Sequence, residues 1–458
     1  MADIFKRNTL KVIIIALSVF TAFSAFCEEP KTKEPDALSL EDAVSLAFKN
    51  NRDILIQENE IKAAQAGILD ARSAFLPKLN VNAGYTRNGA ILSVPAAQNT
   101  KKDIGVFTGY KNDNIVGMEM TQEIYNGGKN TANLRQKEVG LRISEQTLSA
   151  AKLQVEFETK RLFYGLLLAY ETERIAASLV GQAKSHYDDV LKKYEEGTSS
   201  RFDLLQSKVQ LSKLYPELIK AKNAVNLISA ELKKLLGLKI DGPVVLKGKL
   251  EYCPVAIKEG EFLKSAYLNK PEMMLELLGV DLNSWNIQTA KAGGRPQVTS
   301  SLGYSYRSND LGDMFNARHN NWSAGFSVNI PVFDGFSTKA KVDAAKARYA
   351  QAVLSRDNLT EQIAVDIRKA CLDLKQAEAI IDSQKDNIGE AKEALKIAEV
   401  SYDNGEGTNL EVLDAEVSLS QVEKNLSEGI YDYLMAKAYL ERTTGKLFSR
   451  EAWDEKKD

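Results

Sequence analysis

Two acidic residues near the C-terminal end of the sequence, Glu411 and Asp414, are spaced for a shared chemical task. Residues three positions apart on a helix lie on the same face, so both carboxylates would project from one surface. Two carboxylates on one face attract cations and repel one another when they are ionised. This pair is therefore the candidate for an electrostatic role.

Helix capping is the alternative explanation for one of these two carboxylates. Thr408 precedes Glu411 by three positions, and Ser200 precedes Asp203 by the same spacing, so both pairs match a capping box. Glu411 and Asp203 would then serve mainly to begin helices. Asp414 has no such partner, and capping does not explain it.

No catalytic or metal-binding constellation is recognisable in the sequence. The two histidines, His186 and His319, have no neighbours at ligand spacing. The segment 127–130, Gly-Gly-Lys-Asn, has the wrong residue after its lysine for a P-loop and lacks the earlier glycine, so it is better interpreted as a strand-to-helix turn. A nucleophile elbow and a cysteine-pair metal site are also missing from the sequence. We expect neither an enzyme nor a cofactor.

The elements that must position these residues occur twice in the chain. Tyr194 and Gly197 recur 208 residues later as Tyr402 and Gly405. Further upstream the offset is 219 residues, so the first copy carries a loop that is longer by 11 residues, within 85–127. A tandem duplication of this kind predicts a pseudo-symmetric architecture.

Each copy predicts a helix, a β-hairpin, a long helix and a returning helix. An apolar heptad stripe runs over 134–190 without a proline and recurs less cleanly over 342–398. Each stripe predicts a helix of about 60 residues, or about 90 Å, that packs beside others as in a coiled coil. The shorter helices are predicted at 38–75, 200–236, 261–292 and 408–445. Pro216 is expected to bend the second of these.

Four segments alternate between apolar and small or polar residues, which is the period of a half-buried strand. They span 79–85, 116–124, 298–306 and 322–330. An ordinary soluble sheet would alternate in the same way, but aromatic-rich runs of about ten residues also match membrane-spanning strands around a wet lumen. A sheet in lipid has to close, and the smallest such barrels have eight strands. Two, three or four copies of the chain would therefore have to pool their strands.

The N-terminus predicts export. Lys6, Arg7 and Lys11 precede an apolar run over 12–23 that ends in small residues, which is the pattern of a secretory signal peptide over 1–27. The run is too short for a comfortable membrane span. A buried N-terminal helix is disfavoured because nothing amphipathic follows the run.

Cysteine usage and net charge limit the remaining classes. Cys27 raises the alternative of a lipidated N-terminus. The bulky Phe26 directly before it counts against lipidation, because such a site usually has a small residue there. Cys253 and Cys371 remain after cleavage, and their spacing neither requires nor excludes a disulfide. The whole chain has a net charge of −2, and removal of 1–27, which carries +2, leaves about −4. This mild acidity gives no support to a nucleic-acid partner.

Three short motifs occur in a specific order: Leu-Glu-Asp-Ala-Val-Ser-Leu-Ala at 40–47 followed by Asn50-Asn51, then Tyr402-x-x-Gly405, then Leu-Glu-Val-Leu-Asp-Ala at 410–415. With these motifs the chain resembles the TolC-like outer-membrane efflux protein family over essentially its whole mature length. The resemblance implies an α+β membrane protein built from a tandem repeat. As a homotrimer it would form a twelve-stranded β-barrel in the outer membrane, continued by a twelve-helix barrel through the periplasm.

The resemblance also implies a function and partners. Such a trimer is the exit duct of a tripartite efflux pump or a type I secretion system. It conducts substrates passively and docks a periplasmic adaptor and an inner-membrane transporter. A periplasmic coiled-coil scaffold without a channel is the alternative, which explains the heptads and the signal peptide but gives the four strands no purpose. The sequence does not name the cargo.

By resemblance, the gate of the duct lies at the two glycine turns. Gly197 in the first repeat, with Gly405 and Gly407 in the second, would form the periplasmic tip. Glu411 and Asp414 match the acidic rings that narrow the entrance, so three chains would place six carboxylates around one axis.

Links between the tip helices are implied as well. Tyr402 and Asp203 stand where a tyrosine–aspartate link closes the gate in this family. Gly407 stands where some members carry an arginine that strengthens closure, so a weaker lock is a hypothesis for this chain.

The chain is accordingly divided into six segments. These are the signal peptide (1–27), an N-terminal extension (28–37), the first repeat (38–240), an equatorial connector (241–260), the second repeat (261–447) and a charged C-terminal tail (448–458). The longer first loop, 91–111, is expected to face the exterior.

Overall fold

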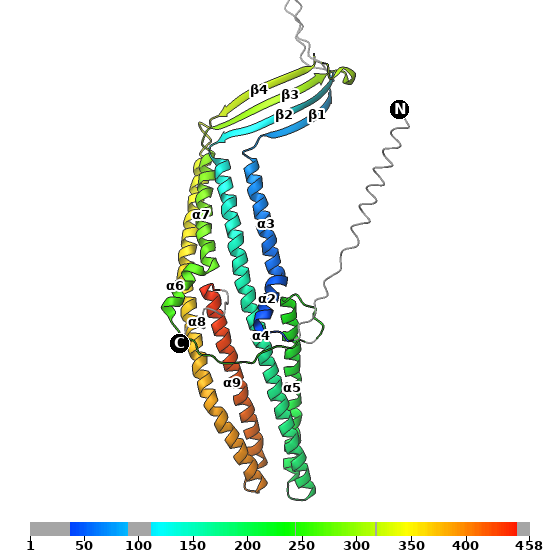
Figure 1. The fold of residues 1–458 in the computed structure, drawn as a ribbon, viewed down its shortest axis with the longest axis vertical. Coiled ribbons are helices and arrows are strands. Elements are labelled where there is room, and N and C mark those ends of the chain that lie inside the picture. The colour runs from blue at the N-terminus through cyan, green and yellow to red at the C-terminus, as the bar shows by residue number, and fades with distance from the viewer. Residues whose placement is uncertain (1–36, 90–110, 243, 317, 447–458) are drawn as a thin grey trace, which may run out of the picture.

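The computed structural model describes residues 37–89, 111–242, 244–316 and 318–446. In these residues the chain is long and slender, with a curved sheet at one end and helices that run from it to the other end (Figure 1). The predicted signal peptide, nearly all of the extension after it, nearly all of the longer first loop and the C-terminal tail lie outside the described residues.

Each repeat supplies two short helices, two strands and two long helices in the same order. The first repeat holds α2 (Leu40–Asn50), α3 (Arg52–Ser73), β1 (Lys78–Arg87), β2 (Asn112–Asn126), α4 (Lys129–Glu195) and α5 (Arg201–Leu235). The second holds α6 (Glu259–Asn269), α7 (Pro271–Ala292), β3 (Gln297–Ser308), the 3-10 turn η1 (Leu311–Asp313), β4 (Asn320–Asn329), α8 (Ser337–Asp403) and α9 (Asn409–Thr444). The predicted strands, long helices and returning helices are confirmed, and α5 continues as one helix through Pro216.

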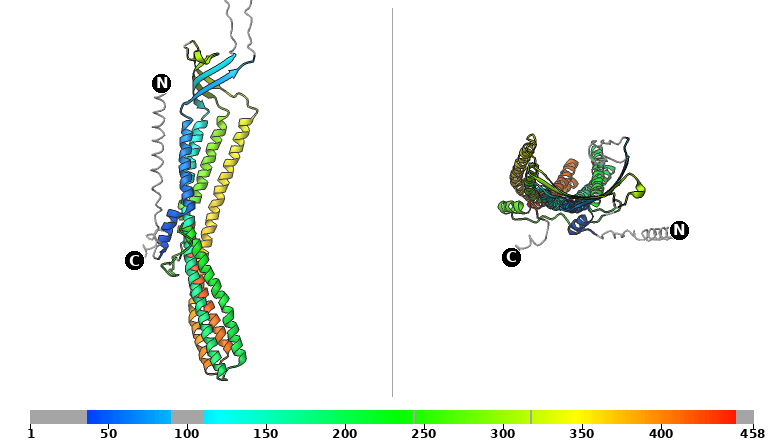
Figure 2. Two further views of the ribbon diagram at one scale, coloured as in Figure 1. Left: turned by 90° about the vertical axis from the view of Figure 1, so that its right-hand side faces the viewer. Right: turned by 90° about the horizontal axis from the view of Figure 1, so that it is seen from above.

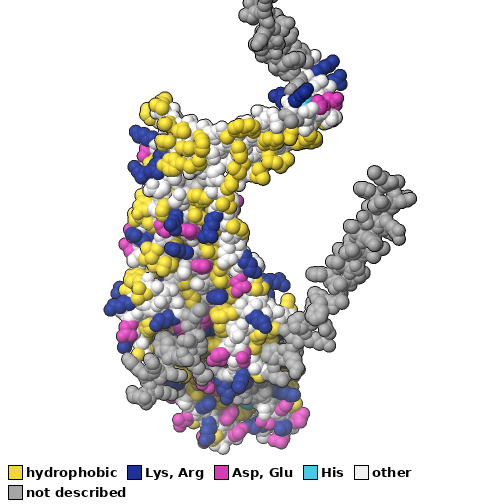
Figure 3. Space-filling view, turned by 45° about the horizontal axis from the view of Figure 1, so that its top comes forward, with side chains coloured by type: hydrophobic (Ala, Val, Ile, Leu, Met, Phe, Trp, Pro, Cys, Tyr) yellow, Lys and Arg dark blue, Asp and Glu magenta, His cyan; other side chains and the backbone are white. Residues whose placement is uncertain are grey.

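The four strands form one antiparallel sheet in the order β1-β2-β3-β4, so β1 and β4 are its edges. The pairing of β2 with β3 shifts register once, between Glu123 and Tyr125. Large apolar side chains on this sheet are exposed to solvent. Trp322 and Phe326, which lie four residues apart on the same face of β4, are 71% and 78% exposed. Figure 3 shows hydrophobic side chains gathered over the strands. One chain therefore presents an open sheet with an exposed apolar face.

The two longest helices, α4 and α8, hold 67 residues each, which is about 100 Å at the standard rise. Both begin at a turn in the left-handed backbone region, formed by Gly127 and Gly128 before α4 and by Gly335 and Phe336 before α8. A side chain at position 127 would place its Cβ 2.6 Å from the carbonyl oxygen of Ala292, so this turn requires glycine. The segment that superficially resembles a P-loop is thus a strand-to-helix turn, as predicted. Among the described helices, none is both long and apolar enough to span a lipid bilayer.

The structure corrects the single helices predicted at 38–75 and 261–292, because each is broken into two. Asn51 lies at the first break and caps α3, since its side-chain oxygen accepts a hydrogen bond from the backbone N–H of Asp53 at 2.9 Å. At the second break Pro271 is the first residue of α7, where the missing N–H of proline removes no helical hydrogen bond. Capping and proline thus override an apolar pattern that continues through both breaks.

Each repeat builds an apolar core around its long helix. The first core joins α2, the start of α3, α4 and α5, and the second joins α6, α8 and α9. Their most buried large members include Ile54, Leu166, Leu232, Ile363, Ile367 and Tyr433. The two hairpins formed by these helices run side by side over the lower half of the molecule (Figure 1). The burial of each large apolar side chain stabilises its hairpin by about two to three kcal/mol.

The connector between the repeats is tied to both cores. Leu38 and Leu246 form a short parallel bridge between the start of the first repeat and the connector. The Tyr433 hydroxyl donates a hydrogen bond to the carbonyl oxygen of Cys253 at 2.9 Å. Cys253 is exposed and Cys371 is buried, and both are free thiols.

Candidate functional site

The two turns that join the long helices to the returning helices lie at the same end of the molecule, farthest from the sheet (Figures 1 and 2). Gly197 after α4 and Gly405 after α8 both hold the backbone in the left-handed region, with φ near 77°. A glycine is favoured there because other residues pay a steric cost in this region. The structure thus brings the glycine turns named from the sequence to one tip.

Gly407 is constrained by its neighbours rather than by its dihedral angles. A Cβ at this position would lie 3.0 Å from the Cβ of Ser401 and 3.0 Å from the backbone nitrogen of Tyr402. The N–H of Gly407 donates to the carbonyl oxygen of Ser401 at 2.9 Å, which fixes this close approach. The turn therefore leaves little room for a side chain at position 407, and the strength of the gate stays a prediction.

Glu411 and Asp203 are helix caps, as their spacing predicted. The backbone N–H of Thr408 donates to Glu411 Oε2 at 2.9 Å, and the Glu411 N–H donates to the Thr408 hydroxyl at 3.3 Å. At the other turn, the Ser200 hydroxyl donates to Asp203 Oδ2 at 2.6 Å. Each carboxylate accepts hydrogen bonds at the first turn of its own helix, and Glu411 is nevertheless exposed to solvent.

Asp414 lies exposed on the next turn of α9, and no hydrogen bond or ion pair holds its carboxylate within the described part of the chain. It borders a hollow of about 460 Å³ between α5 and α9. The hollow is lined by Phe202, Leu205, Gln206, Val209, Gln210, Lys213, Leu410, Leu413 and Asp414. Unlike the carboxylate of Glu411, the carboxylate of Asp414 is therefore not part of a helix cap, and its role at a pore entrance stays a prediction.

Tyr402 packs against the neighbouring hairpin. Its ring centroid lies 5.4 Å from that of His186 on α4, and Lys193 Nζ lies 4.3 Å from the Tyr402 ring centroid. The carboxylate of Asp203 contacts its own cap, so the Tyr402–Asp203 link stays a prediction. Sequence reasoning gave His186 no role, although it lies three residues after Ala183 of the heptad stripe and so faces the partner helices.

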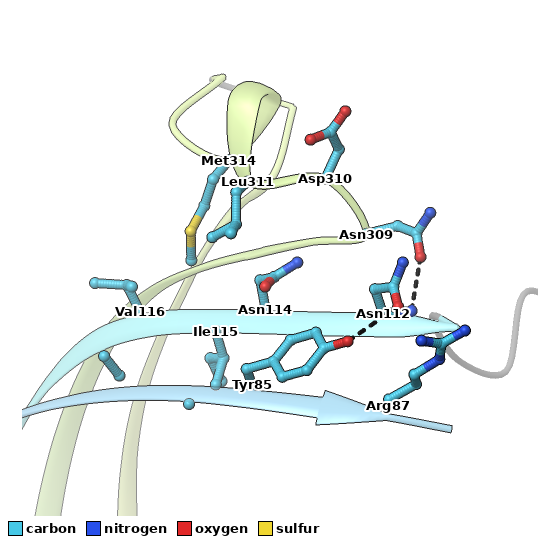
Figure 4. A pocket seen from close by; sticks show the side chains of 12 residues that line it. Tyr85, Arg87, Asn112, Asn114, Ile115, Val116, Asn309, Asp310, Leu311 and Met314 are labelled. Atoms are coloured by element: carbon cyan, nitrogen blue, oxygen red, sulfur yellow. Dashed lines mark hydrogen bonds between the residues drawn. The ribbon is translucent and has the colours of Figure 1, made fainter. Parts of the chain in front are cut away.

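A second hollow, of about 750 Å³, lies at the far end of the sheet between β1, β2 and the segment after β3 (Figure 4). The Tyr85 hydroxyl donates to Asn112 Oδ1 at 3.2 Å, and the Asn112 N–H donates to Asn309 Oδ1 at 2.8 Å. Among the described residues that line it there is no histidine, cysteine or serine. Over the residues that the structure describes, no group of three or more His, Cys, Asp and Glu side chains is arranged to hold a metal ion.

The sequence model of the family described as "Outer membrane efflux protein" matches residues 43–238 and 262–446. The chain belongs to the outer membrane efflux protein family. The two matched stretches correspond to the two structural repeats. This chain is accordingly a channel protein of the outer membrane that extends into the periplasm.

Individual relatives match over most of their length. The outer membrane protein TolC of Vibrio cholerae is 21% identical over 422 residues, which cover 91% of this chain and 93% of TolC. The cation efflux system protein CusC of Escherichia coli K12 is 23% identical over 391 residues, which cover 84% of this chain and 81% of CusC. Among solved structures, the Campylobacter jejuni CmeC outer membrane channel has a TM-score of 0.77 at 22% identity and covers 89% of this chain and 85% of its own. At this identity the likeness shows the fold.

This efflux protein carries a buried carboxyl close to the tip, and its protonation should control the stability of the second hairpin. Glu416 on α9 is 4% exposed; burial, and then the negative charge of Glu399 on α8, raise its pKa from 4.5 to about 7. Since the folded pKa lies above the unfolded one, the stabilising contribution is full below about pH 4.5 and is lost as the pH rises through about 7. Between pH 5.5 and 8 we expect amide exchange around Glu416 to accelerate on the order of tenfold beyond the intrinsic pH effect.

Glu416→Gln is the variant that isolates this effect in hydrogen-exchange mass spectrometry. Glutamine cannot ionise, so protection near position 416 should lose its pH dependence. Glu428→Gln, at an exposed position of the same helix, is the matched control and should behave as the wild type does. An unchanged pH dependence in Glu416→Gln would assign the effect to other groups.

Proposed function

We propose that three copies of this chain assemble into a duct that crosses the outer membrane and continues through the periplasm. The open sheet carries this proposal, because its edges β1 and β4 are unpaired within the described chain and its apolar face is exposed. Backbone groups in lipid must be paired, and four strands are fewer than the eight of the smallest closed barrels. Three copies would close a barrel of twelve strands, with β4 of one chain beside β1 of the next.

The same assembly would gather the long helices of the three chains into one tube below the barrel. Substrates would pass through it without chemistry, delivered by an inner-membrane transporter and a periplasmic adaptor. The names of relatives support this role: the alkaline protease secretion protein AprF of Pseudomonas aeruginosa is 21% identical over 416 residues, and CusC is named as a cation efflux protein. The proposed role is thus the exit duct of a tripartite efflux pump or a type I secretion system.

The proposed gate is the helical tip, with Asp414 and Glu411 at its constriction. Three chains would bring six carboxylates around one axis, and such rings favour cations in a pore. Asp414 contributes more than Glu411 in this proposal, because the carboxylate of Glu411 already accepts the hydrogen bond of a cap.

Single-channel conductance of the purified protein in planar bilayers tests both the duct and its acidic entrance. The wild type should show discrete, cation-preferring openings, and Asp414→Ala should lower the cation preference and shift the conductance by roughly twofold. Asp70→Ala removes the same charge from α3, far from the tip, and should leave the openings unchanged.

The outcomes separate the parts of this proposal. If conductance and cation preference are unchanged in Asp414→Ala, the protein is still a channel, but Asp414 does not act at its entrance. A wild-type protein that stays soluble without detergent and shows no conductance would favour the coiled-coil scaffold instead.

A further inference from the structure

The hollow of about 750 Å³ lies at the end of the sheet farthest from the helices, where β1 ends and β2 begins (Figures 1 and 4). Its volume falls in the range of small-molecule sites. Because the helices of this outer-membrane protein extend into the periplasm, this end of the sheet is the outer end. The hollow therefore lies at the level of the outer leaflet.

The alternation of β1 places the hollow on the apolar side of the sheet. Leu79, Val81, Tyr85 and Arg87 are spaced by even numbers along this strand, so their side chains project from one face. Leu79 and Val81 are 64% and 72% exposed. This is the face that the proposed barrel turns toward lipid, so Tyr85 and Arg87 lie on the outside of the barrel wall.

The segment after β3 folds over this face and encloses the hollow. Asn309 Oδ1 accepts a hydrogen bond from the Asn112 N–H on β2 at 2.8 Å, and Asn114 Nδ2 donates to the Ser308 carbonyl oxygen at 3.1 Å. Asn114 and Met314 are buried, at 4% and 2% exposure. These contacts make the hollow a built part of the fold.

The lining offers a cation and amide donors. Arg87 is exposed and is the one cationic side chain among the described residues that line the hollow, where no hydrogen bond or ion pair holds its guanidinium. The Tyr85 hydroxyl donates to Asn112 Oδ1 at 3.2 Å, and Asn309 Oδ1 accepts the N–H of Asn112. The Nδ2 groups of both asparagines are left as donors. A guanidinium suits a phosphate, and amide donors suit the hydroxyl oxygens of a sugar.

Asp310 is the one acidic side chain among the described residues around the hollow. Its Oδ1 accepts a hydrogen bond from the Gly312 N–H at 2.9 Å, so the carboxylate caps the η1 turn. In Figure 4 this carboxylate points away from Arg87. It therefore leaves the guanidinium available to an anion.

Aromatic side chains mark the membrane interface just below Arg87. The ring centroid of Tyr306 lies 5.4 Å from that of Tyr304 and 5.4 Å from that of Phe315, which is exposed. Tyrosine rings gather where the hydrocarbon of a bilayer meets the headgroups. Arg87 follows Tyr85 by two residues, so it lies about 7 Å farther out along the strand. That is the depth of the headgroup phosphates.

We propose that this hollow binds the phosphorylated sugar headgroup of an outer-leaflet glycolipid, the lipid A part of lipopolysaccharide. Arg87 holds a phosphate, and the amides of Asn112 and Asn309 donate to the sugar. The acyl chains lie along the apolar face of β1, over Leu79 and Val81. The proposal rests on the proposed barrel, which turns this face toward lipid, and it gives each chain one lipid site.

Native mass spectrometry of the full, detergent-solubilised protein, titrated with bisphosphorylated lipid A, tests the site. The wild type should retain one lipid A per chain and should bind phosphatidylglycerol, which has a phosphate but no sugar, about tenfold more weakly. Arg87→Gln removes the cation from an exposed position and should weaken lipid A binding about tenfold. Lys78→Gln is the matched control, because it removes one positive charge from the start of the same strand, about 30 Å away; its affinity should equal that of the wild type.

Two further measurements test the sugar and the source of the phosphate. Asn112→Ala removes an amide donor while keeping the cation, so it should weaken lipid A binding about threefold and leave phosphatidylglycerol binding unchanged. Excess inorganic phosphate should not displace lipid A from the wild type. Displacement would show that the hollow takes free phosphate, and the assignment to a lipid would be wrong.

The proposal is overturned if Arg87→Gln binds lipid A as tightly as the wild type does. It is equally overturned if the wild type binds phosphatidylglycerol as tightly as lipid A, because the hollow then adds nothing to an ordinary lipid-facing surface. The same spectra count the chains in each complex. A wild-type protein that stays monomeric would contradict the proposed duct, and this result differs from a trimer that does not retain lipid A.

Discussion

Alanine in place of Gly445 is expected to lower the free energy of unfolding of the second repeat by about 3 kcal/mol. Gly445 ends α9 in the left-handed region, at φ 72°, where a residue with a Cβ loses about 1–2 kcal/mol. That Cβ would also lie 2.5 Å from the carbonyl carbon and oxygen of Asn269, at the break between α6 and α7. Both neighbours are backbone atoms, so neither can move cheaply. Guanidinium unfolding of the detergent-solubilised protein, followed by circular dichroism, measures the loss.

Gly389→Ala provides the matched control for this substitution. Gly389 lies inside α8, and a Cβ there would meet no atom within 4 Å, so alanine should stabilise the helix by about 1 kcal/mol. A Gly445→Ala protein as stable as the wild type would show that the end of α9 is not anchored on the break between α6 and α7.

The first repeat has the same anchor. Gly237 follows α5 at φ 68°, and a Cβ there would lie 2.8 Å from the Cβ of Asn50 at the end of α2. The sequence shows that Gly237 and Gly445 recur at one offset and that Asn50 and Asn269 recur at another. Nothing in either spacing says that each glycine meets its asparagine, because the contact joins elements separated by most of a repeat.

Local periodicity explains why so much of the fold could be predicted. Period two predicts the four strands and a seven-residue stripe predicts the two long helices, and each pattern depends on residues close together in the chain. The breaks at Asn51 and Pro271 were missed because the apolar pattern runs through them. Their signals were present, since asparagine is a strong N-cap residue and proline favours the first turn of a helix.

The site divides in the same way. The caps that hold Asp203 and Glu411 use partners three residues away, so their spacing alone predicts them. The bond from His186 to Asn409 spans 223 positions, and sequence reasoning could place His186 on the inner stripe of α4 but could not choose its partner. Asp414 was found by resemblance, and its place beside the hollow between α5 and α9 is what the structure adds.

A buried ion cluster between the repeats was also hidden in the sequence. Glu156 and Lys160 look like an ordinary surface pair, four positions apart on one helix. In the fold, Lys160 Nζ lies 2.6 Å from Glu156 Oε1 and 2.6 Å from Glu441 Oε2 on α9, and all three side chains are buried. The cluster joins the first repeat to the end of the second, where α9 packs on α4.

Lys160→Met is therefore expected to cost about 3 kcal/mol or more in the free energy of unfolding. Methionine has a similar volume and packs well, so the loss comes from Glu156 and Glu441, which stay buried without this cation. Guanidinium unfolding measures the change, and exchange in α4 and α9 should accelerate together because the cluster joins them. Lys220→Met is the control: Lys220 pairs with Glu217 on an exposed face, and its loss should cost at most about 0.5 kcal/mol.

The cost of Lys160→Met should come from the charges left behind rather than from the lost bonds. Replacing Glu156, Lys160 and Glu441 together by methionine removes every member of the cluster, and apolar replacement of a whole buried ion cluster is often neutral or stabilising. The triple variant should therefore regain most of the stability that Lys160→Met loses. If it is as unstable as the single variant, the cluster stabilises the contact between α4 and α9 through its hydrogen bonds, and the explanation by uncompensated charge is wrong.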